Sequence, residues 1–93
     1  MAGIRWSGCT GLHVAEPMPD AETLDWLPCY PLPMRNPERT CTICSPVSYE
    51  YGVVGGAYRI RRTDERGQLR ETPPVPRTTA QEWWWLLLAG QAV

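Results

Sequence analysis

The chain has 93 residues, of which 43% are hydrophobic, and its formal net charge is −1 at pH 7. This balance argues against wholesale disorder, and the longest apolar run, residues 83–90, is far shorter than the roughly 20 residues of a membrane span. The N-terminus also lacks the apolar core of a secretory signal. We therefore expect one small domain over residues 1–93, without a membrane partner, in the cytoplasm or, for a phage protein, in the virion. All nine basic residues are Arg, a bias typical of GC-rich bacterial and phage genomes.

Residues 1–46 are expected to be dominated by loops. They hold seven of the ten prolines, and Pro interrupts helices and central strands because it lacks an N–H group. One short helix is predicted near 21–27, where Asp20 can cap the first turn and Pro28 ends the last.

Residues 47–72 are predicted to form an antiparallel sheet of three strands. Apolar and polar side chains alternate from the start of this segment, which is typical of a half-buried strand. The glycines at 55–56 supply the positive φ angles of a two-residue turn. This loop length sets three cross-strand pairs: Val53 with Tyr58, Tyr51 with Ile60, and Glu50 with Arg61. A second turn at 64–67 leads to the third strand, in which Leu69 is predicted to lie opposite Arg62 on the apolar face.

Residues 79–90 are predicted to form a helix rich in Trp. Thr79 and Glu82 have the spacing of a capping box, and Gly90 can end the helix. Three consecutive tryptophans cannot share one face when successive residues are about 100° apart. We expect a packing stripe of Trp83, Leu86 and Leu87, flanked by Trp84 and Leu88, with Trp85 on the opposite side. The fold class is therefore α+β, a small three-stranded antiparallel meander packed by a C-terminal helix.

Cys41 and Cys44 form a C-x2-C pair, the spacing with which one short loop supplies two thiolate ligands to zinc. Zinc needs four ligands. The other two are expected from Cys9 and Cys29, or from Cys9 with His13, whose spacing resembles that of small zinc modules. In a reducing compartment a metal site is favoured over a disulfide framework. Such a site would fasten the Pro-rich half to the first strand; buried thiols, a disulfide and an iron–sulfur cluster are the alternatives.

A resemblance to a known protein family supports the iron–sulfur alternative. The sequence YGVVGG at residues 51–56 is similar to the glycine-rich turn that follows the cluster cysteines of the WhiB-like regulators, which also carry a C-x2-C pair. This resemblance implies an iron–sulfur cluster and a regulatory role. Tyr49, however, occupies the spacing of a further cysteine, and the turn lacks the tryptophan of that family. Zinc is therefore the metal expected here.

No catalytic signature is present, because the chain has one His and lacks the nucleophile-elbow, phosphate-loop and metalloprotease motifs. We expect a non-enzymatic module that binds another protein through an apolar anchor on the helix, oriented by arginines of the sheet. The anchor residues are Trp84, Trp85 and Leu88, and the orienting residues are Arg59, Arg61 and Arg70. Two alternatives are a nucleic-acid-binding regulator that uses the Arg-bearing strand, and a virion or assembly component of a phage that self-associates through the helix.

Overall fold

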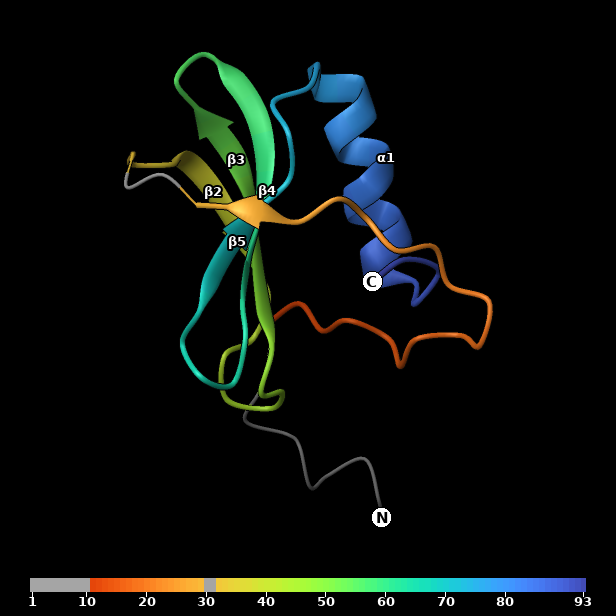
Figure 1. The fold of residues 1–93 in the computed structure, drawn as a ribbon. Coiled ribbons are helices and arrows are strands. Elements are labelled where there is room, and N and C mark those ends of the chain that lie inside the picture. Colours follow the sequence, from red (N-terminus) through yellow and green to blue (C-terminus); the bar gives the residue numbers. More distant parts are fainter. Residues whose placement is uncertain (1–10, 30–31) are drawn as a thin grey trace.

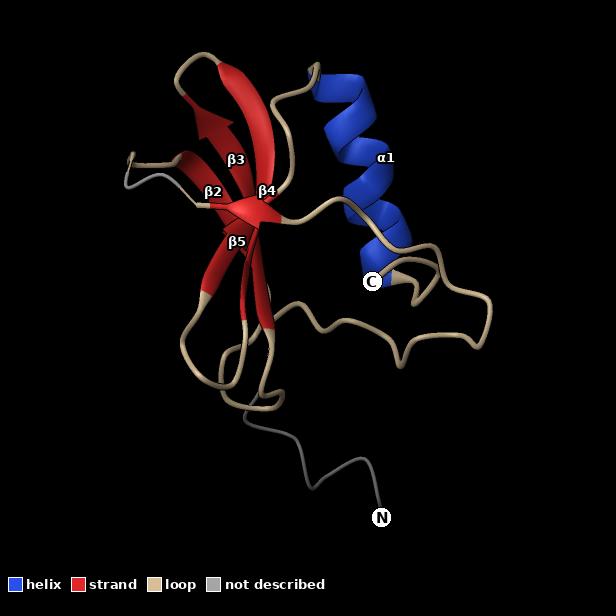
Figure 2. Ribbon diagram, viewed as in Figure 1, coloured by secondary structure: helices blue, strands red, loops and turns tan. Residues whose placement is uncertain are grey.

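The computed structural model describes residues 11–29 and 32–93, in which one helix packs on a five-stranded antiparallel sheet (Figure 1, Figure 2). The sheet order is β1-β5-β4-β3-β2. The elements are β1 (Leu27–Pro28), β2 (Arg35–Arg39), β3 (Ser48–Val54), β4 (Ala57–Thr63), β5 (Leu69–Glu71) and α1 (Arg77–Leu88). Within the described part of the chain, none of the helical structure has the length and apolar character that a membrane span requires. The α+β class is confirmed, whereas the predicted sheet of three strands was too small.

The Pro-rich half contributes two edge strands that were not predicted. β2 pairs with β3, with a register shift between Arg35 and Glu38 that contains Pro37. Pro is tolerated at sheet edges and irregularities because no ladder hydrogen bond is needed from its nitrogen. β1 pairs with β5 through Leu27 and Pro28. The Pro-rich sequence therefore allowed strands at both edges of the sheet.

The helix predicted near 21–27 does not form. The segment runs alongside the last residues of the chain instead: the Leu24 N–H donates to the Val93 carbonyl at 2.8 Å, and the Val93 N–H donates to the Glu22 carbonyl at 2.7 Å. Leu24 is also buried in the core. Because a helix this short is marginal by itself, the backbone pairing with a distant segment overrides the local helix preference.

β3 and β4 pair in the predicted register. Gly55 and Gly56 have φ angles of 61° and 86°, as the two-residue turn requires. Alternation along the strands then separates two faces of the sheet. The face that we call the helix-bearing face carries Tyr49, Tyr51, Ile60 and Arg62, and the face that we call the polar face carries Glu50, Arg59, Arg61 and Glu71.

α1 buries Ala80, Trp84 and Leu87, spaced at i, i+4 and i+7, against the helix-bearing face. The Trp84 ring stacks on Tyr51 with centroids 5.5 Å apart, and its Nε1–H donates to Glu38 Oε1 at 3.2 Å. A Trp side chain in a protein core usually has a hydrogen-bond acceptor for its indole N–H, which is its one polar group. Trp84 is thus a core residue, which corrects its predicted place on a partner surface.

The ends of α1 fit the prediction on one side only. The N-cap residue is Pro76 and makes no side-chain cap hydrogen bond, so the predicted capping box of Thr79 and Glu82 is wrong. Gly90 follows the last turn with a φ of 76°, as expected of a residue that ends a helix. Trp85 is 61% exposed, in agreement with its predicted position opposite the packing stripe.

β5 is shifted by one residue from the predicted register, so that Leu69 lies opposite Thr63 and Arg62 lies opposite Arg70. The turn before β5 is longer than predicted because Asp64 Oδ1 accepts the backbone N–H groups of the second and fourth residues after it, both at 2.9 Å. A one-residue shift exchanges the two faces of a strand. Leu69 is therefore on the polar face and half exposed, not on the apolar side.

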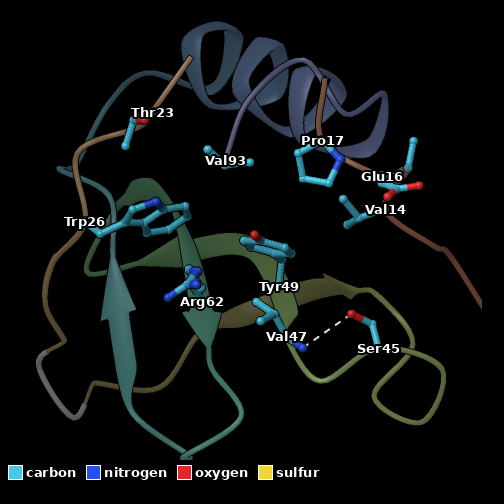
Figure 3. Close-up of a pocket in the computed structure, with 11 residues that line it drawn as sticks. Val14, Glu16, Pro17, Thr23, Trp26, Ser45, Val47, Tyr49, Arg62 and Val93 are labelled. Atoms are coloured by element: carbon cyan, nitrogen blue, oxygen red, sulfur yellow. Dashed lines mark hydrogen bonds between the residues drawn. The ribbon is translucent and has the colours of Figure 1, made fainter. Parts of the chain in front are cut away.

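The N-terminal strap, residues 11–29, passes around the end of α1 (Figure 1). The Ala15 N–H donates to the Leu88 carbonyl at 2.9 Å, which satisfies a carbonyl that the last helical turn leaves unpaired. A Cβ atom on Gly90 would lie 2.5 Å from the Glu16 carbonyl oxygen, so the strap and the helix end are in close contact. A pocket lies between the strap and the sheet (Figure 3).

Candidate metal centre

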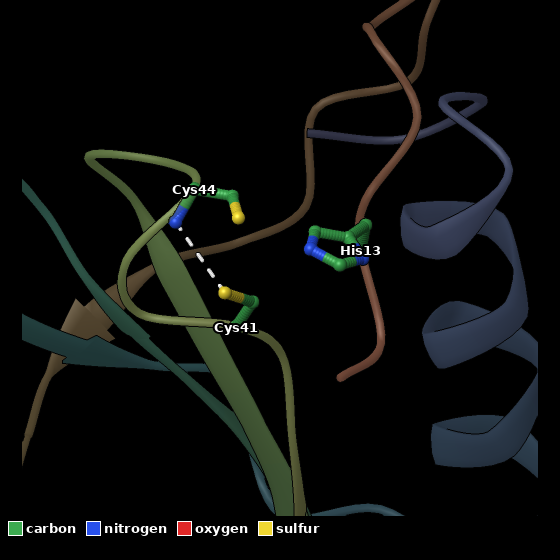
Figure 4. A group of neighbouring side chains, drawn as sticks. All are labelled: His13, Cys41 and Cys44. Carbon is green, nitrogen blue, oxygen red and sulfur yellow. Dashed lines mark hydrogen bonds between the residues drawn. The ribbon is translucent and has the colours of Figure 1, made fainter. Parts of the chain in front are cut away.

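Three of the predicted metal ligands come together beside the sheet: His13 from the N-terminal strap, and Cys41 and Cys44 from the loop between β2 and β3 (Figure 4). Their ligand atoms, one imidazole nitrogen and two Sγ atoms, all lie within 4.8 Å of one another. His13 and Cys44 are exposed and Cys41 is half-buried. The group is therefore accessible to an ion from solvent.

Backbone pairing holds the two segments of the group side by side. Leu12 forms a parallel bridge with Thr40, and the Cys41 N–H donates to the Leu12 carbonyl at 2.7 Å. Thr40 is buried and is fixed to β3, because its N–H donates to the Tyr49 carbonyl and its Oγ1 accepts the Tyr49 N–H, both at 2.9 Å. The main chain next to His13 and next to Cys41 is therefore set by hydrogen bonds that need no metal.

The loop from Cys41 to Cys44 directs two backbone N–H groups at one sulfur. The N–H groups of Ile43 and Cys44 lie 3.4 and 3.3 Å from Cys41 Sγ. A thiolate accepts such bonds more strongly than a neutral thiol does, because hydrogen bonds to a charged acceptor are the stronger ones. The thiolate is also the form of cysteine that binds metal. The loop therefore places two donors at Cys41 Sγ that would stabilise a thiolate.

Two thiolates and an imidazole are a donor set for zinc, whereas calcium and magnesium take oxygen ligands. A tetrahedral structural site needs a fourth ligand. Cys9, which belongs to both predicted ligand sets, lies outside the described residues. It precedes His13 by four positions in the sequence.

Cys29, the predicted alternative to His13, is placed elsewhere. Its thiol donates to Glu71 Oε1 at 3.5 Å, on the polar face near β1, and it is not part of the ligand group found among the described residues. Burial raises the pKa of the Cys29 thiol above its ordinary value of 9.0, with a smaller opposing effect from the positive charge of Arg61. The structure thus replaces Cys29 with His13 in the candidate ligand set.

Glu71 also determines where two of the predicted partner-binding arginines lie. Its carboxylate is 1% exposed; Oε1 accepts the Arg61 Nε–H at 3.0 Å, and Oε2 accepts an N–H of Arg59. Glu50 lies opposite Arg61 as predicted, but it forms its ion pair with Arg39. The Arg59 and Arg61 side chains therefore satisfy a buried carboxylate of the same chain, and their predicted role at a partner surface is unsupported.

The other predicted partner-binding residues lie on the helix side of the molecule. Arg70 is half-buried, and Leu88 is partly buried against the core. Trp85 is exposed beside a shallow groove whose other lining residues are Thr78, Thr79, Gln81 and Glu82.

Comparison of the chain with protein-family models, with curated proteins and with solved structures gave no match.

Proposed function

We propose that this chain is a non-enzymatic, protein-binding module in which a structural zinc ion fastens the N-terminal strap to the sheet. The observation that supports the zinc ion is the convergence of His13, Cys41 and Cys44 within 4.8 Å. Cys9 is the proposed fourth ligand. The two N–H groups aimed at Cys41 Sγ support a thiolate there without reference to the other ligands.

A structural rather than a catalytic role follows from the ligand count. With four protein ligands the zinc ion has no open position for water or substrate. The chain has a single His, and the proposed site uses it, so no second imidazole is present for acid–base catalysis. The zinc ion would link residues 13 and 41–44 and so hold the strap over the sheet.

Metal content and ligand identity test this site directly. Protein refolded with zinc and a thiol reductant, without a His tag, is expected to carry about one zinc per chain in native mass spectrometry and elemental analysis. Cys44→Ser and His13→Ala should lose the ion, and Cys9→Ser should lose it as the fourth ligand. Cys29→Ser is the matched control and should keep full zinc occupancy. Zinc-free wild-type protein, or equal loss from Cys29→Ser, would refute the site, and bound iron would favour a cluster instead.

Trp85 supports the protein-binding part of the proposal. A large aromatic side chain that is 61% exposed is unfavourable in water, and Trp is the residue type most often found as an anchor at protein interfaces. The groove beside it is lined by Thr, Gln and Glu side chains, which can form the polar rim of such a contact. Trp85 therefore replaces the buried Trp84 as the proposed anchor.

Photocrosslinking can test this anchor in the cells that encode the chain. A benzoylphenylalanine at position 85 is expected to capture a second protein. The same group at position 69, which is half exposed on the other face, should not capture it. A product made of two copies of this chain would instead support the assembly-component alternative. Identical products from both positions, or none from position 85, would contradict the proposed anchor.

A further inference from the structure

The pocket between the N-terminal strap and the sheet has a volume of about 530 Å³, within the range of about 300–1,000 Å³ that is usual for small-molecule sites. Its wall on the strap side contains Val14, Pro17 and Trp26, and its wall on the sheet side contains Val47, Tyr49 and Arg62 (Figure 3). Most of the surface that lines it is therefore apolar or aromatic, with few charged groups.

Two aromatic rings define the apolar part of the pocket. Trp26 and Tyr49 have ring centroids 5.9 Å apart and are tilted by 38°, so they meet without closing the space between the strap and the sheet. Figure 3 shows Arg62 below the Trp26 ring and beside Tyr49, with Glu16 at the opposite rim. An aromatic or branched apolar group placed here would contact both rings.

Arg62 brings a positive charge to this pocket, whose lining also includes Glu16. It lies directly opposite Arg70 in the sheet, and both side chains are half-buried. Like charges at directly opposed positions repel each other. No carboxylate of the described residues forms an ion pair with either of them. The negative charge of Asp64, whose carboxylate accepts two backbone N–H groups, also acts on Arg62.

The polar face of the same sheet shows the opposite arrangement. All ion pairs found among the described residues lie there, and they balance Arg39, Arg59 and Arg61 with two glutamates. The chain thus neutralises the arginines on the face without the pocket. Among the residues that the structure describes, the two facing arginines on the face that carries the pocket form no ion pair with a carboxylate.

We infer that this pocket binds a small organic anion that combines a carboxylate with an aromatic or branched apolar body. The carboxylate would accept hydrogen bonds from Arg62, and Arg70 would add to the positive field. The apolar body would lie against Trp26 and Tyr49. Arginine is suited to this role because its planar guanidinium binds a carboxylate through two parallel hydrogen bonds. This ligand site is separate from the Trp85 surface, and its lining residues Val14 and Ser45 directly follow the proposed zinc ligands His13 and Cys44.

Calorimetric titration of the full chain with 1-naphthoate tests the site. We expect one site per chain, and the neutral analogue 1-naphthalenemethanol should bind about tenfold more weakly, the effect of one lost charge-assisted hydrogen bond. Arg62→Gln should weaken naphthoate binding by about the same factor. Arg66→Gln, in the exposed turn before β5, is the matched control and should bind like the wild type. Equal affinity of the acid and the alcohol, or of Arg62→Gln and the wild type, would reduce the site to an apolar patch and overturn the inference.

Two further measurements distinguish a lost ligand site from an unfolded protein. Removal of one of two facing like charges should leave Arg62→Gln at least as resistant to urea as the wild type, so its loss of binding would not reflect unfolding. Ala15→Phe places a large side chain at an exposed position in the pocket wall and should abolish naphthoate binding without unfolding the protein. Undiminished binding to Ala15→Phe, or no binding of naphthoate to the wild type at millimolar concentration, would also overturn it.

Discussion

Replacing Glu71 by Gln removes the charge at the centre of the polar face. The Glu71 side chain is 1% exposed, and its carboxylate pairs with Arg59 and Arg61, whose side chains are 19% and 10% exposed. The Cys29 thiol also donates to it. Gln has nearly the same shape, so the substitution creates no large cavity. Its main effect is to remove the negative charge with which two poorly solvated guanidinium groups pair.

The expected loss of stability is large for a chain of this size. Removal of one partner from a buried ion pair costs about 3–5 kcal/mol, and the amide oxygen of Gln can still accept one N–H, so we expect about 3 kcal/mol. This is a substantial part of the 5–15 kcal/mol that is typical of a folded domain. At about 4–8 °C per kcal/mol, the melting temperature should fall by about 12–24 °C.

Glu50→Gln is the matched control, since Glu50 lies on the same face and pairs with Arg39. The side chains of that pair are 29% and 64% exposed, and an exposed pair contributes only about 0–1 kcal/mol. Urea unfolding at pH 7, followed by circular dichroism at equal metal content, measures both variants. A loss for Glu71→Gln that is below about 1 kcal/mol, or equal to that for Glu50→Gln, would refute the assignment of Glu71 as a buried structural charge.

Three further predictions concern single residues. Gly90→Ala should destabilise the protein more than Gly67→Ala, by about 1–3 kcal/mol. Both glycines have positive φ, but only at Gly90 would the new Cβ meet another backbone atom. Equal losses of stability in urea unfolding would contradict the close contact of strap and helix. The pKa of Asp64 is lowered from its ordinary value of 3.8, chiefly by the hydrogen bond from the Gln68 N–H. The stability that the Asp64 carboxylate adds to the turn should therefore be complete above pH 3.8 and lost as the pH falls through the lower pKa of the folded state. A carboxyl titration by NMR with a midpoint at or above 3.8 would argue against this prediction. Burial raises the pKa of Cys29 above 9.0, so the stability gained from its protonated thiol should be complete below pH 9.0 and lost as the pH rises through the pKa of the folded state. Iodoacetamide at pH 8 should alkylate Cys29 more slowly in the folded chain than in urea. Equal rates would show that the thiol is not protected.

The sequence was sufficient for the hairpin of β3 and β4 and for the end of α1. Two adjacent glycines indicate one of the few short turns that require positive φ angles, and a two-residue loop leaves only one register for the strands that it joins. Gly90 is a similarly local signal. The position of Trp85 could also be predicted, since consecutive residues on a helix point in different directions whatever the partner.

The candidate metal site was predictable in part. The C-x2-C spacing depends on one short loop, so Cys41 and Cys44 could be paired from the sequence. The choice between His13 and Cys29 depends on which segment of a loop-rich chain lies beside that loop. The backbone hydrogen bond from Cys41 to Leu12 brings His13 beside that loop, and no periodicity in the sequence predicts this contact.

The tertiary structure alone determined the features that involve distant segments. Residues 22–24 have a local preference for helix, but the N–H groups of Glu22 and Leu24 donate to carbonyls at the end of the chain. Trp84 rather than Trp83 enters the core because Tyr51 and Glu38 offer it a ring and a carboxylate. The one-residue shift of β5 brings Arg70 opposite Arg62 and Glu71 opposite Arg61. Local signals fix turns and periodicity because they act within a few residues, whereas burial, ion pairing and ligand convergence depend on contacts that exist only after the chain has folded.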